Sequence, residues 1–566
     1  MNLHKNKIFL FLLPVILLAS CKKSLDDAYL NPNAPTVVPV ESLLPGVIGS
    51  MVGASSGTGV SGGVAGDALV IGRYLQYWGD NTGQANANVL YDEMGGPVFT
   101  SGTLATIWNG FYTGQGQNLN QIITWGSQQQ KWDYVGVAWA IRAWGWLELA
   151  NEYADGIIVK EAFNTSQQQF DYDPQSLAYD TCRATCLRAL SFLSRTDGAV
   201  SKTNLNLGDA FMNQGDVTKW QKFVYGVLAR SYGYLSNKTI YSGSGYADST
   251  IKYCNLAMTT NADNTTAKFA GNVNVSGMNS YYGPTRGNVG GLRQAAYIVN
   301  LMTGANSALP GIFDPRAFYM LRMNLSNNFA GITPWLGNGV GGGFSTSATD
   351  ANFPPNFWGN TPLPQSASAP TGASLGTLDS GRYLFRNAAE FPLMTASEMQ
   401  FLLAEAAFRK GDKSTALAAY VNAISLNFDM LSTGYNFNIP AAQAITPTNK
   451  AAYLAAVTPA SPGALTLTQI MLQKYIALYG WGPQETWVDM RRFHYVDHDP
   501  ATGNQVYADF TPPSGIYMYI NNGGDGKYVY RAKPQNVEYT YDVPSLTAIG
   551  ALNLDYHTKE CWFSMP

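Results

Sequence analysis

The chain is poor in charge, histidine and cysteine for its length. Asp, Glu, Lys and Arg make up 13% of its 566 residues, and the 35 basic and 38 acidic side chains nearly balance. Because no basic tract or excess of Lys and Arg is present, nothing electrostatic favours nucleic acid as a partner. Five cysteines are too few for a disulfide framework in so long a chain.

Catalytic motifs are also scarce. No His-Glu-x-x-His, Walker loop or Cys/His zinc spacing occurs, so metal hydrolysis and phosphoryl transfer lack their residues. Gly53-Ala54-Ser55-Ser56-Gly57 fits a nucleophile elbow, and Gly57, Gly59 and Gly62 fit a dinucleotide loop, but both patterns need strands that the sequence does not predict. A glycine-rich loop is the better interpretation. We expect no catalytic residue, metal ion or cofactor.

One apolar run stands at the N-terminus. Ile8 to Leu18 follow His4, Lys5 and Lys7 and are too few to span a bilayer, which predicts a signal peptide over residues 1–20. Leu18-Ala19-Ser20-Cys21 has the small residues of a bacterial lipobox, so Cys21 is the predicted site of lipid attachment. The alternative is an ordinary secretory signal that holds Cys21 by chance. Residues 21–41 are then a lipidated tether that leads into the folded body.

The body, residues 42–566, is expected to be mainly α-helical. Apolar spacing predicts helical pairs at about 103–153, 174–235, 395–427 and 465–492. In the clearest pair, Thr395-Ala396-Ser397-Glu398 forms a capping box, and Asp412 can cap the second helix. Ala and Tyr at the contacts indicate tetratricopeptide-like packing. The region of about 271–379, rich in Gly, Ser, Asn and Pro with interspersed aromatics, predicts long irregular loops that form a binding face.

Several segments resemble one family when they are taken together and in order. They are Lys22-Lys23-Ser24-Leu25-Asp26-Asp27, Ile107-Trp108, Leu228-Ala229-Arg230, Asp314-Pro315-Arg316, Ala404-Glu405-Ala406, Gln473-Lys474-Tyr475 and Trp487 with Asp489, Arg491 and Arg492. On these segments the chain resembles the SusD/RagB nutrient-binding outer-membrane lipoproteins of Bacteroidetes, over essentially its whole mature length.

The resemblance implies a SusD-like fold and a role in nutrient uptake. A lipid-anchored protein exposed on the outer membrane would capture a nutrient, chiefly an oligosaccharide, and deliver it to a SusC-like TonB-dependent transporter. The same family also includes peptide binders. Two alternatives come from other classes: a surface glycoside hydrolase, since the separation of two carboxylates is a spatial quantity, and a helical-repeat adaptor that binds only protein partners.

Aromatic residues are abundant, at 13% of the chain, and 34 tyrosines with 57 glycines suit a surface for polar, neutral ligands. Exposed rings can stack on sugar CH groups while polar side chains bind hydroxyls. Each ring can instead belong to the core, because aromatics dominate cores as well as sites. The predicted substrate-binding residues are Trp78, Asp80, Tyr91, Tyr281, Tyr282, Arg286, Trp335, Phe357 and Trp358.

Overall fold

The computed structural model describes most of the chain after the predicted tether. It covers residues 38–53, 62–80, 104–164, 166–271, 276–336, 351–358, 381–518 and 523–566, without the side chains of Asp80 and Ser276. Cys21, Tyr91 and most of the glycine-rich loop at 53–62 therefore lie outside the described residues.

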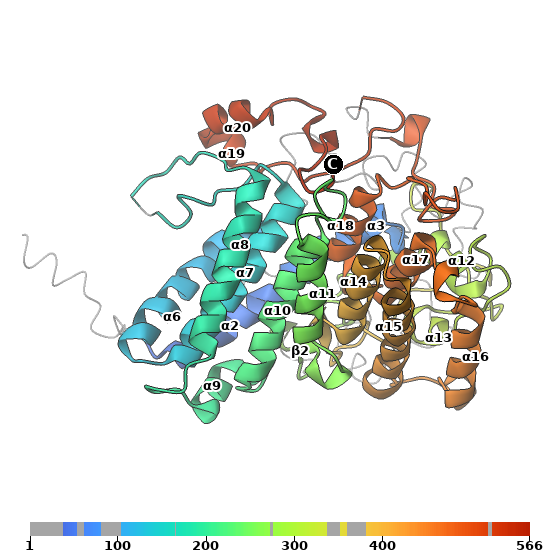
Figure 1. Cartoon of the computed structure of the whole chain (residues 1–566), viewed down its shortest axis with the longest axis horizontal. Coiled ribbons are helices and arrows are strands. Elements are labelled where there is room, and N and C mark those ends of the chain that lie inside the picture. The colour runs from blue at the N-terminus through green and yellow to red at the C-terminus, as the bar shows by residue number, and fades with distance from the viewer. Residues whose placement is uncertain are drawn as a thin grey trace, which may run out of the picture.

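Helices dominate the described chain (Figure 1), which confirms the expected mainly α fold. None of them combines the length and the apolar composition needed to cross a bilayer. The first half contains α2 (Val40–Val52), α3 (Gly63–Tyr74), α5 (Thr106–Asn109), the π-helical turn η3 (Gly110–Gln115), α6 (Gly116–Gln128), α7 (Trp132–Tyr153), α8 (Gln175–Leu193), α9 (Lys202–Asp209), α10 (Val217–Gly233), α11 (Tyr246–Leu256) and the 3-10 turn η4 (Asn261–Asp263).

The second half continues the helical pattern. It contains η5 (Ser276–Met278), α12 (Ala296–Thr303), α13 (Ala317–Met320), α14 (Ala396–Arg409), α15 (Lys413–Gly434), η8 (Ala441–Gln443), α16 (Pro447–Val457), η9 (Pro462–Ala464), α17 (Leu467–Ala477), α18 (Pro483–Arg492), η10 (Gly515–Tyr517), α19 (Glu538–Tyr541), α20 (Val543–Ile549) and η12 (Tyr556–Thr558).

Neighbouring helices form one continuous row. α6 packs on α7, α7 on α8, α8 on α10, α10 on α11, α11 on α14 and α14 on α15, and Figure 1 shows them side by side. Such a row buries a shared core between successive pairs. Glycine permits close approach within it: a Cβ on Gly136 of α7 would lie 2.7 Å from Cγ of Leu193 on α8.

Two short antiparallel sheets join distant parts of the chain. β1 (Trp78–Asp80) pairs with β3 (Leu292–Gln294), and Trp78 faces Gln294 across the ladder. β2 (Thr265–Ala267) pairs with β4 (Phe391–Met394), the strand that leads directly into α14. The sheets therefore tie the irregular segments to the helical row.

The start of α14 differs from the predicted capping box. Thr395 Oγ1 accepts a hydrogen bond from the Glu398 N–H at 3.2 Å, as expected for an N-cap. The Glu398 carboxylate does not return to the N-cap, because both of its oxygens accept hydrogen bonds from Arg230, at 2.7 and 2.8 Å. Asp412 does cap α15, by accepting from the Thr415 N–H at 3.1 Å.

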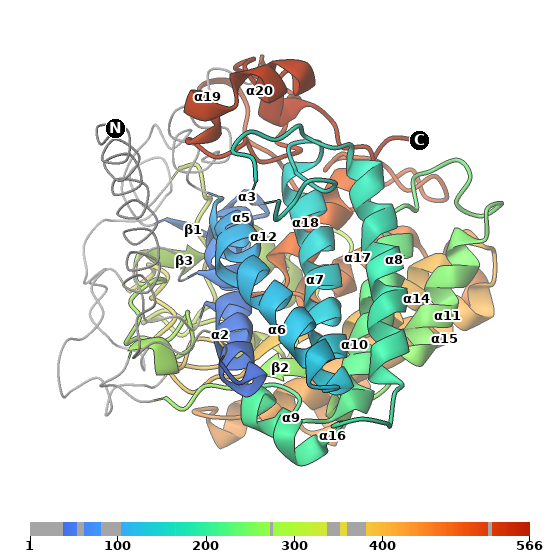
Figure 2. The ribbon, with the colours of Figure 1, turned by 90° about the vertical axis from the view of Figure 1, so that its left-hand side faces the viewer.

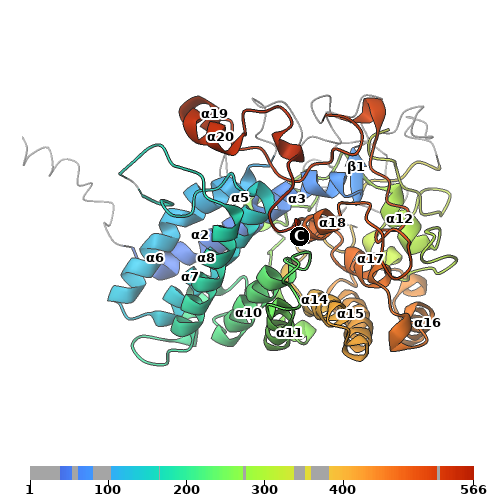
Figure 3. The same ribbon diagram turned by 45° about the horizontal axis from the view of Figure 1, so that its top comes forward.

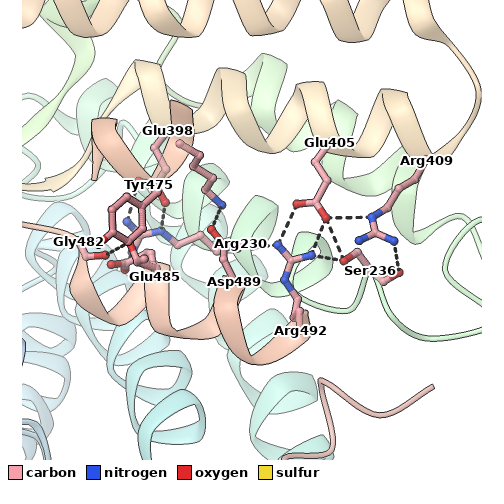
Figure 4. A network of polar contacts seen from close by, with 12 residues as sticks. Arg230, Ser236, Glu398, Glu405, Arg409, Tyr475, Gly482, Glu485, Asp489 and Arg492 are labelled. Atoms are coloured by element: carbon pink, nitrogen blue, oxygen red, sulfur yellow. Dashed lines mark hydrogen bonds and ion pairs between the residues drawn. The ribbon is translucent and has the colours of Figure 1, made fainter. Parts of the chain in front are cut away.

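Arg230 of α10 is the centre of a buried charge network (Figure 4). Besides Glu398, its guanidinium forms an ion pair with Glu485 of α18 at 2.6 Å and lies 3.5 Å from Glu148 of α7. Burial raises the pKa of Glu148 well above its usual range and the pKa of Glu485 to about 7, and repulsion between neighbouring carboxylates adds to both. One arginine thus links four helices.

A second set of ion pairs lies along the same helices. Arg492 of α18 donates to both Glu405 oxygens, at 2.6 and 2.8 Å, and to Asp489 at 2.6 Å. Asp489 also pairs with Lys474 of α17 at 2.8 Å. Although burial opposes it, Arg492 and Arg409 hold the pKa of Glu405 below its usual range. We refer to the contacts of Arg230 and Arg492 together as the arginine network.

Replacing Arg230 with Met should lower the free energy of unfolding by about 3–5 kcal/mol, because the carboxylates around it would lose their cation inside the protein. Chemical denaturation would measure the loss. The control is Arg195→Met, which removes a surface ion pair with Asp197 and a guanidinium 3.7 Å from the Trp132 ring and should cost only about 1 kcal/mol. Equal midpoints for the two variants would contradict the structural role of Arg230.

His494 should make stability depend on pH. Its ring nitrogens lie 2.6 Å from Asp497 Oδ2 and 2.9 Å from Glu560 Oε1. The hydrogen bond to Asp497, with help from Glu560 and against burial, raises the pKa of His494 to about 9. Its contribution is therefore complete below the unfolded pKa near 6.5 and is lost as pH rises from there to about 9. Melting curves of His494→Gln should show a smaller decline over this window than those of the parent; an unchanged decline would be the contrary result.

Candidate functional site

Four of the predicted binding residues lie together, but inside the protein. Trp78 meets Tyr282 edge to face with ring centroids 6.1 Å apart, and Phe357 stacks on Phe385 at 4.1 Å. Tyr282 also stacks on Phe385, at 6.0 Å, while Trp358 Nε1 donates to the Tyr282 carbonyl oxygen at 2.8 Å. We call Trp78, Tyr282, Phe357, Trp358 and Phe385 the aromatic cluster.

Burial of the cluster corrects the expectation of exposed stacking rings. Trp78, Tyr282, Phe357 and Trp358 are each no more than 2% exposed. Trp78 donates its indole N–H to the Leu69 carbonyl at 2.8 Å, so this polar group is satisfied without a ligand. Since loops with few charges and many glycines gain order chiefly by burying large rings, these aromatics anchor the loops to the core.

Tyr281, Arg286 and Trp335 are partly exposed, and Tyr281 contacts Tyr282 of the cluster with ring centroids 6.0 Å apart. The Arg286 guanidinium lies over the Tyr281 ring at 5.2 Å, and its Nη1 donates to the Gly53 carbonyl at 2.8 Å. Burial lowers the pKa of Arg286 and raises the pKa of Tyr281. The pair therefore presents one face of a ring and a guanidinium with several donors.

β1 brings Asp80 near Trp335. A Cβ on Gly79 would lie 2.9 Å from Cα of Pro334, the residue before Trp335. Ile332 in turn donates its N–H to the Gln294 carbonyl at 2.9 Å, so residues 332–335 run beside the β1–β3 sheet. We define the loop face as Tyr281, Arg286 and Trp335 with the backbone of Asp80. Tyr91 lies outside the described residues.

The turn at 281–286 is shaped by a residue far away in sequence. Asn387 accepts hydrogen bonds from the Ser280 N–H through its carbonyl oxygen, at 2.8 Å, and from the Thr285 N–H through Oδ1, at 3.1 Å. Sequence reasoning did not identify Asn387, because an isolated asparagine in an irregular segment carries no periodic signal. Asn387, which lies 102 residues after Thr285, therefore holds the turn that carries Tyr281 and Arg286.

The carboxylates around Arg230 do not form a glycosidase site. A carboxyl group with a raised pKa is a common sign of acid catalysis, and Glu485 has one. However, Glu148, Glu398 and Glu485 are no more than 6% exposed and surround the guanidinium. A glycosidic bond cannot reach them, so the raised pKa values of Glu148 and Glu485 come from burial within the folded core.

Comparisons with known proteins identify the fold and the family. A family model described as "Starch-binding associating with outer membrane" (SusD-like) matches residues 32–514. A SusD/RagB family protein from Bacteroides thetaiotaomicron is similar at a TM-score of 0.63 and 19% identity, covering 93% of this chain and 99% of that one. No curated protein matches.

Two further solved structures agree. A SusD homolog from Bacteroides uniformis is similar at a TM-score of 0.63 and 16% identity, and a chitin-binding SusD homolog from Flavobacterium johnsoniae at 0.61 and 16%; each comparison covers 93% of this chain and 99% of the other. At such identities the likeness shows the fold, and the family follows from the model match. The chain belongs to the SusD-like family, non-catalytic glycan-binding proteins that associate with the outer membrane.

Proposed function

We propose that the protein is a lipid-anchored, cell-surface receptor that binds an oligosaccharide at the loop face and passes it to a SusC-like TonB-dependent transporter. The observation that carries the proposal is the partly exposed Tyr281–Arg286 pair, which lies against the buried aromatic cluster through the contact of Tyr281 with Tyr282. Rings that pack on buried residues are already ordered, so they lose little conformational entropy when a ligand stacks on them.

The chemistry of the loop face suits a sugar. Tyr and Trp offer a flat apolar surface with a polar group at the edge, and an arginine can donate several hydrogen bonds to hydroxyls. Chitin is the ligand named for two similar structures and starch for the family, so chitohexaose and maltohexaose are the first ligands to test. A peptide is the competing ligand, and binding of peptides without sugars would replace this part of the proposal.

The lipid anchor is proposed from the sequence around Cys21. A lipidated Cys21 would carry more than one acyl chain, and each buried CH2 contributes about 0.8 kcal/mol, which gives effectively permanent attachment. The residues between Cys21 and Val40 would then connect the membrane to α2.

Replacing Cys21 with Ala should release the protein from the outer membrane, because the lipid is the proposed hydrophobic anchor. Fractionation of cells that express the variant, with immunoblotting of membrane and soluble fractions, checks this. Ser20→Ala keeps a small residue before the thiol and serves as the control. Retention of Cys21→Ala in the membrane at the parent level would contradict lipid anchoring.

Replacing Tyr281 or Trp335 with Ala should weaken oligosaccharide binding about five- to tenfold, which corresponds to roughly 1 kcal/mol for a stacked ring. Calorimetry measures the affinity, and melting should show that both variants stay folded. Trp358→Ala is the contrast: this ring is buried, so its removal should cost about 3–5 kcal/mol of stability. Normal binding by both loop-face variants would place the site elsewhere.

A further inference from the structure

A pocket of about 410 Å³ lies between the helical row and the C-terminal segment. It is formed by α5, η3 and the start of α6, by the loop between α7 and α8, and by α19. Figure 1 shows that loop beside α19 at the top of the molecule. We call it the aromatic pocket. The described residues that line it are Trp108, Tyr112, Gln117, Ile158, Ala162, Phe163, Asn164, Gln168, Phe170, Val537, Glu538, Tyr541 and Asp542.

The aromatic wall is held in place from within. Trp108 and Tyr112 meet edge to face at 4.8 Å, and the Phe163 ring lies 6.1 Å from Tyr112. The Tyr112 hydroxyl donates to the Ile158 carbonyl at 2.7 Å and accepts from the Ile158 N–H at 2.9 Å. These bonds fix the loop against η3, so the rings are ordered before any ligand arrives.

Two backbone features mark this wall as unusual. η3 is a π-helical turn (Gly110–Gln115), and such turns are rare and frequent at functional sites. Phe163 has a φ of 68°, a left-handed conformation that is unfavourable for an aromatic residue and tends to persist where function requires it. Both features place side chains into the pocket.

Several polar groups in the pocket have no hydrogen-bond partner within the described part of the chain. The Trp108 indole N–H, the Gln117 amide and the Tyr541 hydroxyl form no hydrogen bond with any described residue. Glu538 receives the Tyr172 hydroxyl on Oε2 at 2.9 Å, which leaves Oε1 available. Donors and acceptors set among apolar rings are the usual anatomy of a small-molecule site.

The charge of the lining selects against anions. No lysine or arginine is among the described lining residues, whereas Glu538 and Asp542 are. Burial raises the pKa of both carboxyl groups. A uronic acid or sulfated sugar would meet repulsion and find no cation, so a neutral sugar fits best.

The pocket continues into a second hollow of about 560 Å³, lined by Ser166, Gln167, Gln168, Gln169 and Tyr541. Gln168 and Tyr541 belong to both hollows, and Gln169 Nε2 donates to the Tyr541 carbonyl at 2.7 Å. The amides of Gln167 and Gln168, together with the Gln169 amide oxygen, can bind the hydroxyls of further sugar units. The combined groove suits a chain of sugars.

We propose that the aromatic pocket is a second glycan site, for a neutral oligosaccharide, separate from the loop face. This inference rests on the proposed glycan-binding function and extends it. The two sites share no residue. Figure 2 shows β1 and β3 well apart from α19 and α20, and Figure 3 shows the same for β1. Two sites on one receptor would raise retention of a polymer through effective concentration.

The test uses the full mature chain without its lipid and four probes: chitohexaose, maltohexaose, cellohexaose and the anionic hexagalacturonate. Tyr541 is 69% exposed, so Tyr541→Ala should fold normally. The matched control is Phe437→Ala, which removes another exposed ring, 52% exposed. The loop-face double variant Tyr281→Ala, Trp335→Ala completes the set, and calorimetry measures each affinity.

We expect binding of at least one neutral hexaose to survive in the loop-face double variant. Adding Tyr541→Ala should weaken this remaining binding about five- to tenfold, whereas adding Phe437→Ala should not change it. Binding that Tyr541→Ala weakens while the loop-face variant behaves as the parent would support the pocket and refute the loop face.

Three results would overturn the proposal. They are loss of all hexaose binding in the loop-face double variant, remaining binding that Tyr541→Ala leaves unchanged, and competition by hexagalacturonate for that remaining binding. Failure of the parent chain to bind any neutral hexaose would refute the pocket assignment and the proposed function together.

Discussion

The buried Arg230 guanidinium is the interaction on which the rest of the structure depends. It faces Glu398 of α14, Glu485 of α18 and Glu148 of α7 from α10, so helices from both halves of the chain meet at one cation. Removing charges from water is costly unless hydrogen bonds replace the lost hydration. These contacts therefore form only when all four helices are correctly placed. They depend on the whole fold as well as stabilise it.

The segments that resemble the SusD/RagB family are largely the members of this network. Leu228-Ala229-Arg230, Ala404-Glu405-Ala406 and the segment with Asp489 and Arg492 supply its cations and carboxylates. Asp314-Pro315-Arg316 belongs to a second buried group, in which Arg316 reaches Asp314, Asn427 and Gln473. The resemblance therefore comes from residues that hold the helical scaffold together. This explains why the fold can be recognised from the sequence while the ligand cannot.

Periodicity predicted the long helical pairs because their apolar residues repeat at helical spacing, but it missed α2 and α3. Those helices contain Pro45 and several glycines, which indicate a loop when they are read locally. The structure uses the glycines for packing: a Cβ on Gly72 would overlap the Trp78 ring. Tertiary contact overrides propensity here, and no local pattern contains that information. The partner of the Glu398 side chain could not be predicted for the same reason, because Arg230 lies 168 residues away in the sequence.

The aromatics show where sequence reasoning stops. Tyr281 and Tyr282 are adjacent and chemically identical, yet one is partly exposed and the other is buried under Trp78. Predicted rings can therefore lie close together in the fold and yet be buried, as Trp358 is. The aromatic pocket was not predicted from the sequence, because its residues Trp108, Phe163 and Tyr541 come from three separate segments and share no motif. Binding surfaces of this kind arise where loops meet a scaffold already fixed by buried charge, so the loops can differ in sequence without loss of the fold.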